Sequence, residues 1–441
     1  MSSSATPNYS RSLIVVTSLF FLWGFITVLV DSLIPRLKEI FELTYFQAGL
    51  VQSAFFMAYG LLSIPAGFIL ARIGYKKGML LGLATMGVGC LLFWPAASMR
   101  VFGIFLLGYF VLAAGMTILQ VAANPFVSVL GDPRKASSRL NLSQAFNSLG
   151  TTIAPAIGAM FILSDNILSS EELSQLAVAQ KLNYLASEAS AVQMPFVILA
   201  ASLLLLAGFV GMSKLPQVLN TEYAGNYRQA LKNTQLVKGA IGIFVYVGAE
   251  VAIGSYLVNY FLDMNLAEAI KESGVLSRTS SYILNTGDLN SVDTKGIVGA
   301  FVMFYWGGAM VGRFIGAYLT SVLPPGKVLS CFAAGAVLMI LISMNTNGLI
   351  AMISILAVGL FNSIMFPTIF TIAIEGLGDL KPQGSGILCT AIAGGAFIPP
   401  LYGYLTDMAG FKMAFVLLLI CYGYILCYGL ISKRLVPKAS E

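Results

Sequence analysis

Long apolar stretches follow one another along the chain, and each is about as long as a helix that crosses a bilayer. Short polar or basic turns separate twelve of them, and most reach the ~20 residues that span ~30 Å of hydrocarbon. The predicted spans are 12–35, 46–71, 78–98, 101–129, 141–163, 194–213, 238–261, 297–321, 327–344, 347–372, 383–406 and 411–432. The pattern predicts an all-α membrane protein with twelve transmembrane helices.

Three connections between the spans are long, and the middle one divides the chain. Residues 164–193 and 262–296 form two of them, while 214–237 is basic and separates the sixth span from the seventh. We therefore predict an N-terminal six-helix half (1–213), a cytoplasmic linker (214–237) and a C-terminal six-helix half (238–441).

Two pairs of segments suggest that the halves are pseudo-symmetric. "GFILARIGYKKGML" (67–80) follows the second span, and "GAYLTSVLPPGKVL" (316–329) follows the eighth. "ANPFVSVLGD" (123–132) and "MFPTIFTIAIEGLGD" (365–379) each hold a proline and end in Leu-Gly-Asp. Matched positions in the two halves are typical of an internally duplicated transporter.

Composition supports a membrane protein and excludes several kinds of chemistry. The 441 residues are 58% hydrophobic and 10% charged, against about 25% charged in soluble domains. The chain has no histidine, and its five cysteines lack metal-ligand spacing, so neither a zinc site nor a Ser-His-Asp triad is expected. No nucleotide-binding motif occurs either. We expect no enzyme activity, no cofactor and no nucleic-acid partner, and any uphill transport must use an ion gradient.

The distribution of charge predicts how the chain lies in the membrane. If the N-terminus is inside, most of the 25 Lys and Arg residues fall at cytoplasmic ends of spans, Arg313 among them. Acidic residues gather in the two long outer connections. No cleavable signal peptide is evident. Both termini are therefore expected in the cytoplasm.

Two carboxylates at membrane depth are candidate functional groups, because burying an ionisable side chain in lipid is costly. Asp31 follows Gly24 and Thr27 at helical spacing in the first span, although a role as an interfacial residue stays open. Glu250 lies in the middle of the seventh span on one face with Tyr246. Since histidine is absent, any proton would have to be carried by such carboxylates.

Paired amides form a second group of candidates. Gln120 and Asn124 share a face of the fourth span, and Gln144 and Asn147 share a face of the fifth. Such amides either hold helices together or line a pocket for hydroxyl groups. Two weaker candidates in the second half are Trp306 and Asn362.

Prolines interrupt several spans. Each removes a backbone hydrogen bond and frees the carbonyl four residues earlier, which in lipid must find another donor. The prolines concerned are Pro125, Pro155, Pro367, Pro399 and Pro400. Such helices often line cavities or act as hinges.

With two six-span halves and "GFILARIGYKK" (67–77), the chain resembles the major facilitator superfamily. Within it, the chain is similar to the fucose/galactose/glucose:cation symporters. The motifs that carry this similarity are "FLWGFITVLVDSLIP", "FQAGLVQSAFFMAYG", "AANPFVSVLG", "RLNLSQAFNS" and "FPTIFTIAIEGLG". The resemblance implies uptake of a monosaccharide coupled to a cation, with Asp31, Gln144 and Asn147 matching functional positions of the family.

The sequence departs from the family pattern at three positions. Ala71 stands where the loop motif has an acid, and Gln120 stands where fucose carriers have an acid in the fourth span. Glu250 follows "YVGA", where those carriers have glutamine. One carboxylate is therefore shifted to the second half, which favours glucose- or galactose-type specificity and leaves the choice between a proton and sodium open.

We accordingly expect a bacterial inner-membrane symporter that moves a hexose with H⁺ or Na⁺ by alternating access and works as a monomer. Asp31 and Glu250 are the predicted cation-coupling residues, and Asp31 would be the metal ligand if the ion is sodium. The residues that would bind the sugar are Gln120, Asn124, Gln144, Asn147, Glu250, Trp306 and Asn362. A drug:proton antiporter, a hexose uniporter and a receptor of the same fold are the alternatives.

Overall fold

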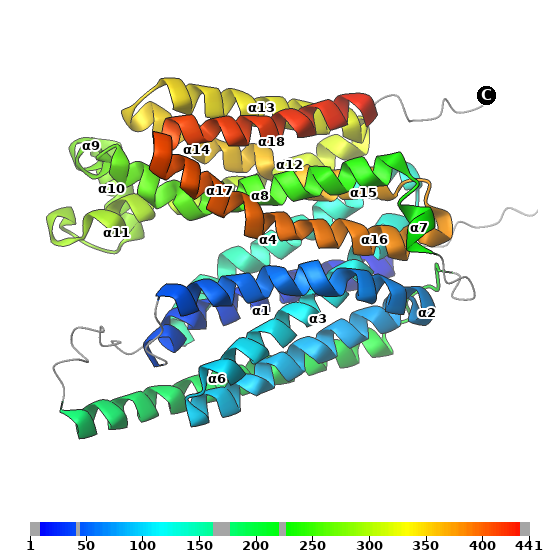
Figure 1. Ribbon diagram of the computed structural model, residues 1–441, viewed down its shortest axis with the longest axis horizontal. Helices are drawn as coiled ribbons and strands as arrows, with labels where there is room; N and C mark the ends of the chain where they lie inside the picture. Colours follow the sequence, from blue (N-terminus) through cyan, green and yellow to red (C-terminus); the bar gives the residue numbers. More distant parts are fainter. Residues whose placement is uncertain (1–8, 41–44, 162–176, 220–225, 433–441) are drawn as a thin grey trace, which may run out of the picture. The chain divides into compact units, whose positions relative to one another are not determined.

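The computed structural model describes residues 9–40, 45–161, 177–219 and 226–432. Within these ranges some side chains, among them those of 30–40, lie outside the described set. The described residues are almost entirely helical and contain no strand (Figure 1). Ten of their helices are long and apolar enough to cross a membrane.

The elements follow the predicted spans closely. In chain order they are α1 (Ser10–Ile40), α2 (Tyr45–Met99), α3 (Phe102–Val129), η1 (Pro133–Lys135), α4 (Ala136–Phe161), α6 (Val178–Met212), α7 (Tyr227–Ala230), α8 (Thr234–Asp263), α9 (Leu266–Glu272), α10 (Gly274–Ile283), η2 (Leu289–Ser291), α11 (Thr294–Gly299), α12 (Val302–Val322), α13 (Pro325–Asn345), α14 (Gly348–Asn362), α15 (Met365–Ile374), η3 (Gly378–Leu380), α16 (Lys381–Thr390), η4 (Ala391–Ala393), α17 (Gly394–Ala409) and α18 (Phe411–Ser432).

Helix α2 contains two predicted spans, which are joined at Gly74. This residue has φ 81° and ψ 165°, a conformation that is open to glycine and strained for residues with a Cβ. The predicted tenth span is also divided, into α14 and α15, and the eleventh into α16 and α17. These breaks lie close to the prolines and glycines of the sequence.

The two long connections contain more helix than the apolar pattern predicts. Helix α6 begins at Val178, well before the predicted start at 194, and α9, α10 and α11 occupy much of 262–296. These segments mix helix-favouring residues such as alanine and leucine with serine, lysine and glutamate, and the polar residues lower the hydropathy. A search for apolar runs therefore misses them.

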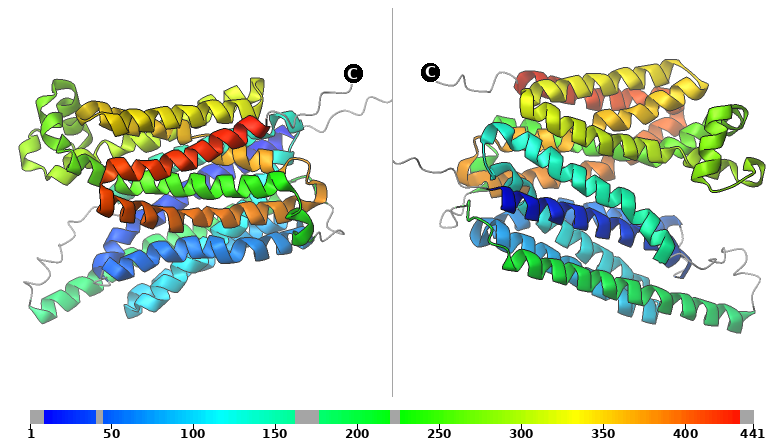
Figure 2. Two further views of the ribbon diagram at one scale, coloured as in Figure 1. Left: turned by 45° about the horizontal axis from the view of Figure 1, so that its top comes forward. Right: turned by 180° about the vertical axis from the view of Figure 1, so that it is seen from behind.

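The chain forms two compact units, each with its own packing. Unit 1 consists of residues up to 136, 146–233 and 374–391, and unit 2 of 137–145, 234–373 and 392 onward. In unit 1, α2 packs along α3 and α6, and α16 packs on α2 and α3. In unit 2, α13 packs on α14 and α18, α12 on α14, and α8 on α17 and α18 (Figure 2). The predicted domain boundaries stay a prediction.

Small residues allow the closest helix contacts in unit 1. At Gly89 of α2, a Cβ would lie 2.5 Å from the backbone nitrogen of Leu112 in α3. No side chain fits there without movement of the backbone. Such close approach is how membrane helices gain packing energy when lipid provides no hydrophobic drive between them.

Two of the proline-freed carbonyls receive hydrogen bonds from side chains of other helices. Pro125 frees the carbonyl of Val121, and the hydroxyl of Ser385 in α16 donates to it at 2.8 Å. Pro367 frees the carbonyl of Ser363, and Nε of Arg313 in α12 donates to it at 3.2 Å. Both carbonyls thus have the hydrogen-bond donor that they were expected to need.

Candidate functional site

In unit 1, the Gln120 amide is anchored by a tyrosine. Its Nε2 donates to Oη of Tyr59 at 2.6 Å, and the Tyr59 side chain is 1% exposed. The ring of Phe55 lies beside it, with centroids 5.2 Å apart. Gln120 itself is partly exposed. A fixed but accessible amide is suited to hydrogen bonding a ligand.

Asn124, one turn further along α3, is more enclosed. Its side chain is 0% exposed, and its backbone carbonyl accepts a hydrogen bond from Ser128 Oγ at 2.9 Å. Gln120 and Asn124 therefore differ in access, although the sequence places them on the same face. Gln120 is the member of the pair that a solute reaches more easily.

The amides of α4 fall in different units. Asn147 lies in unit 1 and donates from Nδ2 to the carbonyl of Phe20 in α1 at 2.9 Å. Gln144 is 8% exposed and lies in the short part of α4 that belongs to unit 2. Asn147 thus fastens α4 to α1, which is the helix-joining role that the sequence left open.

The predicted stripe of the first span faces its neighbours in unit 1. A Cβ at Gly24 would lie 2.6 Å from Nδ2 of Asn147, and the Thr27 hydroxyl contacts the sulfur of Met116 at 3.3 Å. Asp31 lies within α1, one turn after Thr27, but its side chain is outside the described residues.

In unit 2, Glu250 belongs to a buried polar cluster. Asn362 Nδ2 donates to Oη of Tyr305 at 2.7 Å, and that hydroxyl donates to the backbone carbonyl of Glu250 at 3.4 Å. Tyr305 and Asn362 are both 0% exposed, whereas Glu250 keeps part of its side chain accessible. The tyrosine thereby connects α8, α12 and α14 at the level of the carboxylate.

Among the residues that the structure describes, Arg313 is the cation that interacts with Glu250. The guanidinium of Arg313 lies close enough to attract its carboxylate, and the phenol of Tyr246 faces it from one turn earlier in α8. An arginine beside a carboxylate inside a helix bundle compensates a charge that is expensive to leave alone. Arg313 therefore offsets part of the cost of a charge at Glu250.

Trp306, in α12, packs against Gly254, which lies one turn beyond Glu250 in α8. Its ring edge rests on Gly254, where a Cβ would lie 2.9 Å from Cζ2, and it meets the Tyr305 ring edge-on at 5.1 Å between centroids. About half of the side chain is exposed. The structure thus brings Trp306 and Asn362 into the neighbourhood of Glu250.

Sequence reasoning missed three members of this cluster. Arg313 is counted there among the basic residues at cytoplasmic ends, but it lies inside α12, where the freed Ser363 carbonyl holds it. Tyr305 and Tyr422 resemble ordinary apolar core positions in the sequence, and only the fold shows that they lie near Glu250. The sequence feature that could have identified Arg313 is a basic residue within a predicted apolar span.

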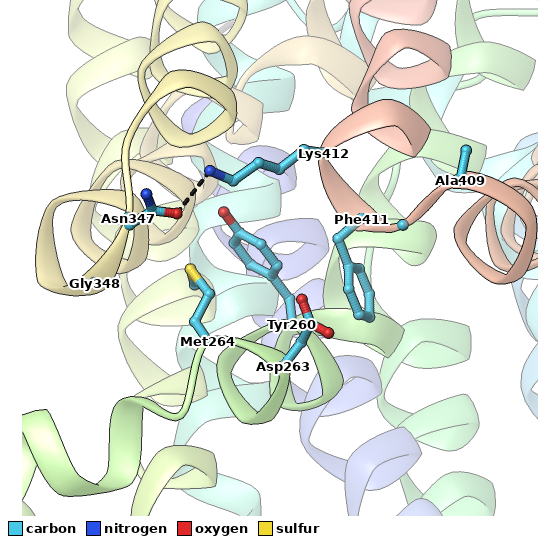
Figure 3. A pocket seen from close by; sticks show the side chains of 9 residues that line it. Tyr260, Asp263, Met264, Asn347, Gly348, Ala409, Phe411 and Lys412 are labelled. Carbon is cyan, nitrogen blue, oxygen red and sulfur yellow. Dashed lines mark hydrogen bonds between the residues drawn. The ribbon is translucent and has the colours of Figure 1, made fainter.

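A pocket of about 460 Å³ opens elsewhere in unit 2 (Figure 3). Its lining residues are Tyr260, Asp263, Met264, Asn347, Gly348, Ala409, Gly410, Phe411 and Lys412. Lys412 Nζ donates to Oδ1 of Asn347 at 2.7 Å. None of the residues predicted from the sequence lines this pocket. Among the side chains that the structure describes, no group of His, Cys, Asp or Glu could hold a metal.

Comparison with known proteins identifies the family. The model of the Major Facilitator Superfamily matches residues 13–387. The chain belongs to this superfamily. It is therefore a multi-pass membrane protein, and the predicted all-α fold with twelve spans in two six-helix halves agrees with the family and its solved structures.

Individual relatives cover nearly the whole chain. A glucose/galactose transporter of Brucella abortus (strain 9-941) is 47% identical over 98% of this chain and 96% of its own. The L-fucose-proton symporter of Escherichia coli K12 is 35% identical over 91% of this chain and 89% of its own. The crystal structure of the superfamily transporter FucP in its outward conformation has a TM-score of 0.85 at 33% identity, covering 96% and 99% of the two chains.

Proposed function

We propose that this protein imports a hexose of glucose or galactose type together with H⁺ or Na⁺ across a bacterial inner membrane. The observation that carries the proposal is the full-length similarity to a glucose/galactose transporter, at 47% identity. The lower identity to fucose-proton symporters supports the same class of substrate and coupling, with a different sugar preferred.

The proposed sugar site draws on both six-helix halves. Its members are Gln120, Asn124, Gln144, Asn147, Glu250, Trp306 and Asn362. Gln120 and Glu250 combine partial exposure with buried polar support, which suits them to contact sugar hydroxyls directly. Asn362 would act by holding Tyr305, and Trp306 offers a half-exposed ring to the apolar face of a sugar.

Asp31 and Glu250 are the proposed coupling carboxylates, and the structure favours dividing their roles. Arg313 already compensates Glu250 within unit 2, so Glu250 suits the sugar more than a transported cation. Asp31 then receives the proton or sodium ion. Neutralising it would lower the cost of closing the transporter around its substrate.

Transport would proceed by alternating access of the two halves in a monomer, with both termini in the cytoplasm. Orientation follows from the basic residues at the predicted cytoplasmic ends. Pro125 within α3 and Pro367 beside the junction of α14 and α15 provide the proposed places where bending costs least, because their freed carbonyls are already bonded to side chains.

Counterflow into proteoliposomes tests the substrate. Vesicles preloaded with unlabelled hexose should take up labelled glucose or galactose faster than unloaded vesicles, and fucose should compete more weakly. Absence of counterflow with every hexose would overturn the proposal. Export of lipophilic cations instead would identify the drug:proton antiporter.

Two substitutions test the site. Gln120→Ala and Glu250→Gln should each weaken hexose binding about tenfold or more, because a site built around hydroxyl groups loses a specific partner. Gln193→Ala is a matched control, since this amide bonds only the exposed Ser98 in the contacts shown. Wild-type affinity in both site variants would contradict the assignment.

A further inference from the structure

Two buried phenols in unit 2 face polar groups without a hydrogen bond of full geometry. Tyr246 and Tyr422 are 1% and 0% exposed, and neither Oη atom makes such a bond among the described residues. Tyr246 faces Glu250, and Tyr422 faces Asn362. Buried hydroxyl groups in native proteins are nearly always bonded, so an unpaired one calls for an explanation. Here two such groups lie in one cluster.

Both phenols lie around the same carboxylate. Tyr246 precedes Glu250 by one turn of α8, and its phenol interacts with the Glu250 carboxyl group. Tyr422 comes from α18, which packs on α8, and lies within electrostatic range of both Tyr246 and Glu250. A phenol is a good donor and an ionised carboxylate accepts only. The two kinds of group are therefore complementary.

The remaining neighbours leave this role to the phenols. Arg313 attracts the carboxylate but also holds the carbonyl of Ser363. The hydroxyl of Tyr305 donates to the backbone of Glu250 and accepts from Asn362. These groups are engaged in hydrogen bonds of full geometry. The hydroxyl of Tyr246 faces the Glu250 carboxylate itself, and that of Tyr422 faces Asn362 and interacts with Glu250.

We propose that Tyr246 and Tyr422 are positioning residues that take up the Glu250 carboxylate whenever it is not bound to sugar. The inference rests on the proposed role of Glu250 as a sugar ligand. Binding of the sugar then requires the carboxylate to leave the phenols. The pair competes with the substrate, and it prevents Glu250 from standing unpaired in the empty site.

Competition predicts an unusual direction of effect. Tyr422→Phe keeps the ring and removes the donor, so it should destabilise the empty site more than the occupied one. Hexose Kd should therefore fall at least threefold, and Tyr246→Phe should act in the same direction. A merely structural hydroxyl would leave Kd unchanged or raise it. Tyr428→Phe, another buried phenol on α18, is the matched control and should not tighten binding.

A second measurement needs no sugar. Tyr422→Phe is made in the wild-type protein and in Glu250→Met, whose side chain has similar length and no strong acceptor. Thermal unfolding of the sugar-free protein should show a loss of Tm on Tyr422→Phe with Glu250 present and a clearly smaller loss with Met. Equal losses in both backgrounds would overturn the pairing of phenol and carboxylate.

The two measurements separate the proposals. If no hexose binds any variant, the proposed function fails, while the unfolding cycle still decides whether the phenols pair with Glu250. If Tyr422→Phe lowers Tm more in the presence of Glu250 than of Met, but hexose Kd does not fall in either phenylalanine variant, competition with the sugar is overturned. A Glu250-dependent loss of Tm together with a lower hexose Kd supports the inference in full.

Discussion

At the scale of single residues, the polar groups of the interior are held by specific partners instead of being scattered. Gln120 is fixed by Tyr59, and Asn362 by Tyr305, with donor–acceptor distances of 2.6 and 2.7 Å. Both tyrosines are buried. Holding an amide in one orientation allows it to distinguish a hydroxyl group at a defined position from one that is absent.

The Asn362–Tyr305 bond gives a direct prediction about stability. Asn362→Leu should lower the free energy of unfolding by about 0.5–2 kcal/mol, the range of interhelical hydrogen bonds in membranes. Tyr305→Phe should act similarly, and the double variant should lose less than the sum. Strictly additive losses, measured by denaturant or thermal unfolding in detergent, would show that the two groups do not interact.

At the scale of elements, the apolar pattern predicts the membrane-spanning helices, because hydropathy is what drives them into lipid. The same pattern fails for the start of α6 at Val178 and for α9–α11, whose sequences are polar but helical. Arg313 was expected at a cytoplasmic helix end, whereas it lies inside α12. Its side chain donates there to the carbonyl of Ser363, which is distant in the sequence. Contacts between distant segments cannot be inferred from spacing along one of them.

The proline inside α3, Pro125, provides a test of its own. Ser385→Ala should destabilise the protein by about 1 kcal/mol, because the Val121 carbonyl loses its donor. In a Pro125→Ala background the restored N–H can bond that carbonyl, so Ser385→Ala should then cost less. Equal costs in the two backgrounds, measured by thermal unfolding, would contradict this explanation of the break.

Helices α2 and α16 cross at a notch filled by a residue of the predicted linker. The Tyr227 hydroxyl in α7 donates to the carbonyl of Ile64 at 2.5 Å. A Cβ at Gly386 would lie 2.6 Å from that hydroxyl and 2.8 Å from the carbonyl oxygen of Ser63. The Ser63 carbonyl belongs to the backbone of α2, so it cannot give way without movement of that helix. The crossing is therefore intolerant of any larger residue.

Gly386→Ala should consequently lower the free energy of unfolding by about 1–3 kcal/mol through overpacking. Gly423→Ala is the control, because a Cβ there meets nothing within 4 Å and alanine favours helix over glycine. The control should be neutral or slightly stabilising in the same unfolding assay. Equal behaviour of the two variants would show that the notch is not tightly packed.

At the scale of the whole molecule, the family and its fold were accessible from the sequence, and the position of the candidate residues was accessible only in part. The carboxylate at 250 was identified because no snorkelling reach exists in mid-span. Two of its tyrosine neighbours were not, because Tyr305 and Tyr422 have the pattern of core residues until the helices are packed.

Cation-coupled hexose transport is tested most directly with Asp31→Asn, because this variant separates coupling from binding. Wild-type protein in proteoliposomes should accumulate glucose or galactose above its external concentration when an inward H⁺ or Na⁺ gradient is imposed separately. Asp31→Asn should retain sugar counterflow and lose gradient-driven accumulation. Equilibration without accumulation under both gradients in the wild-type protein would contradict the account and identify a uniporter.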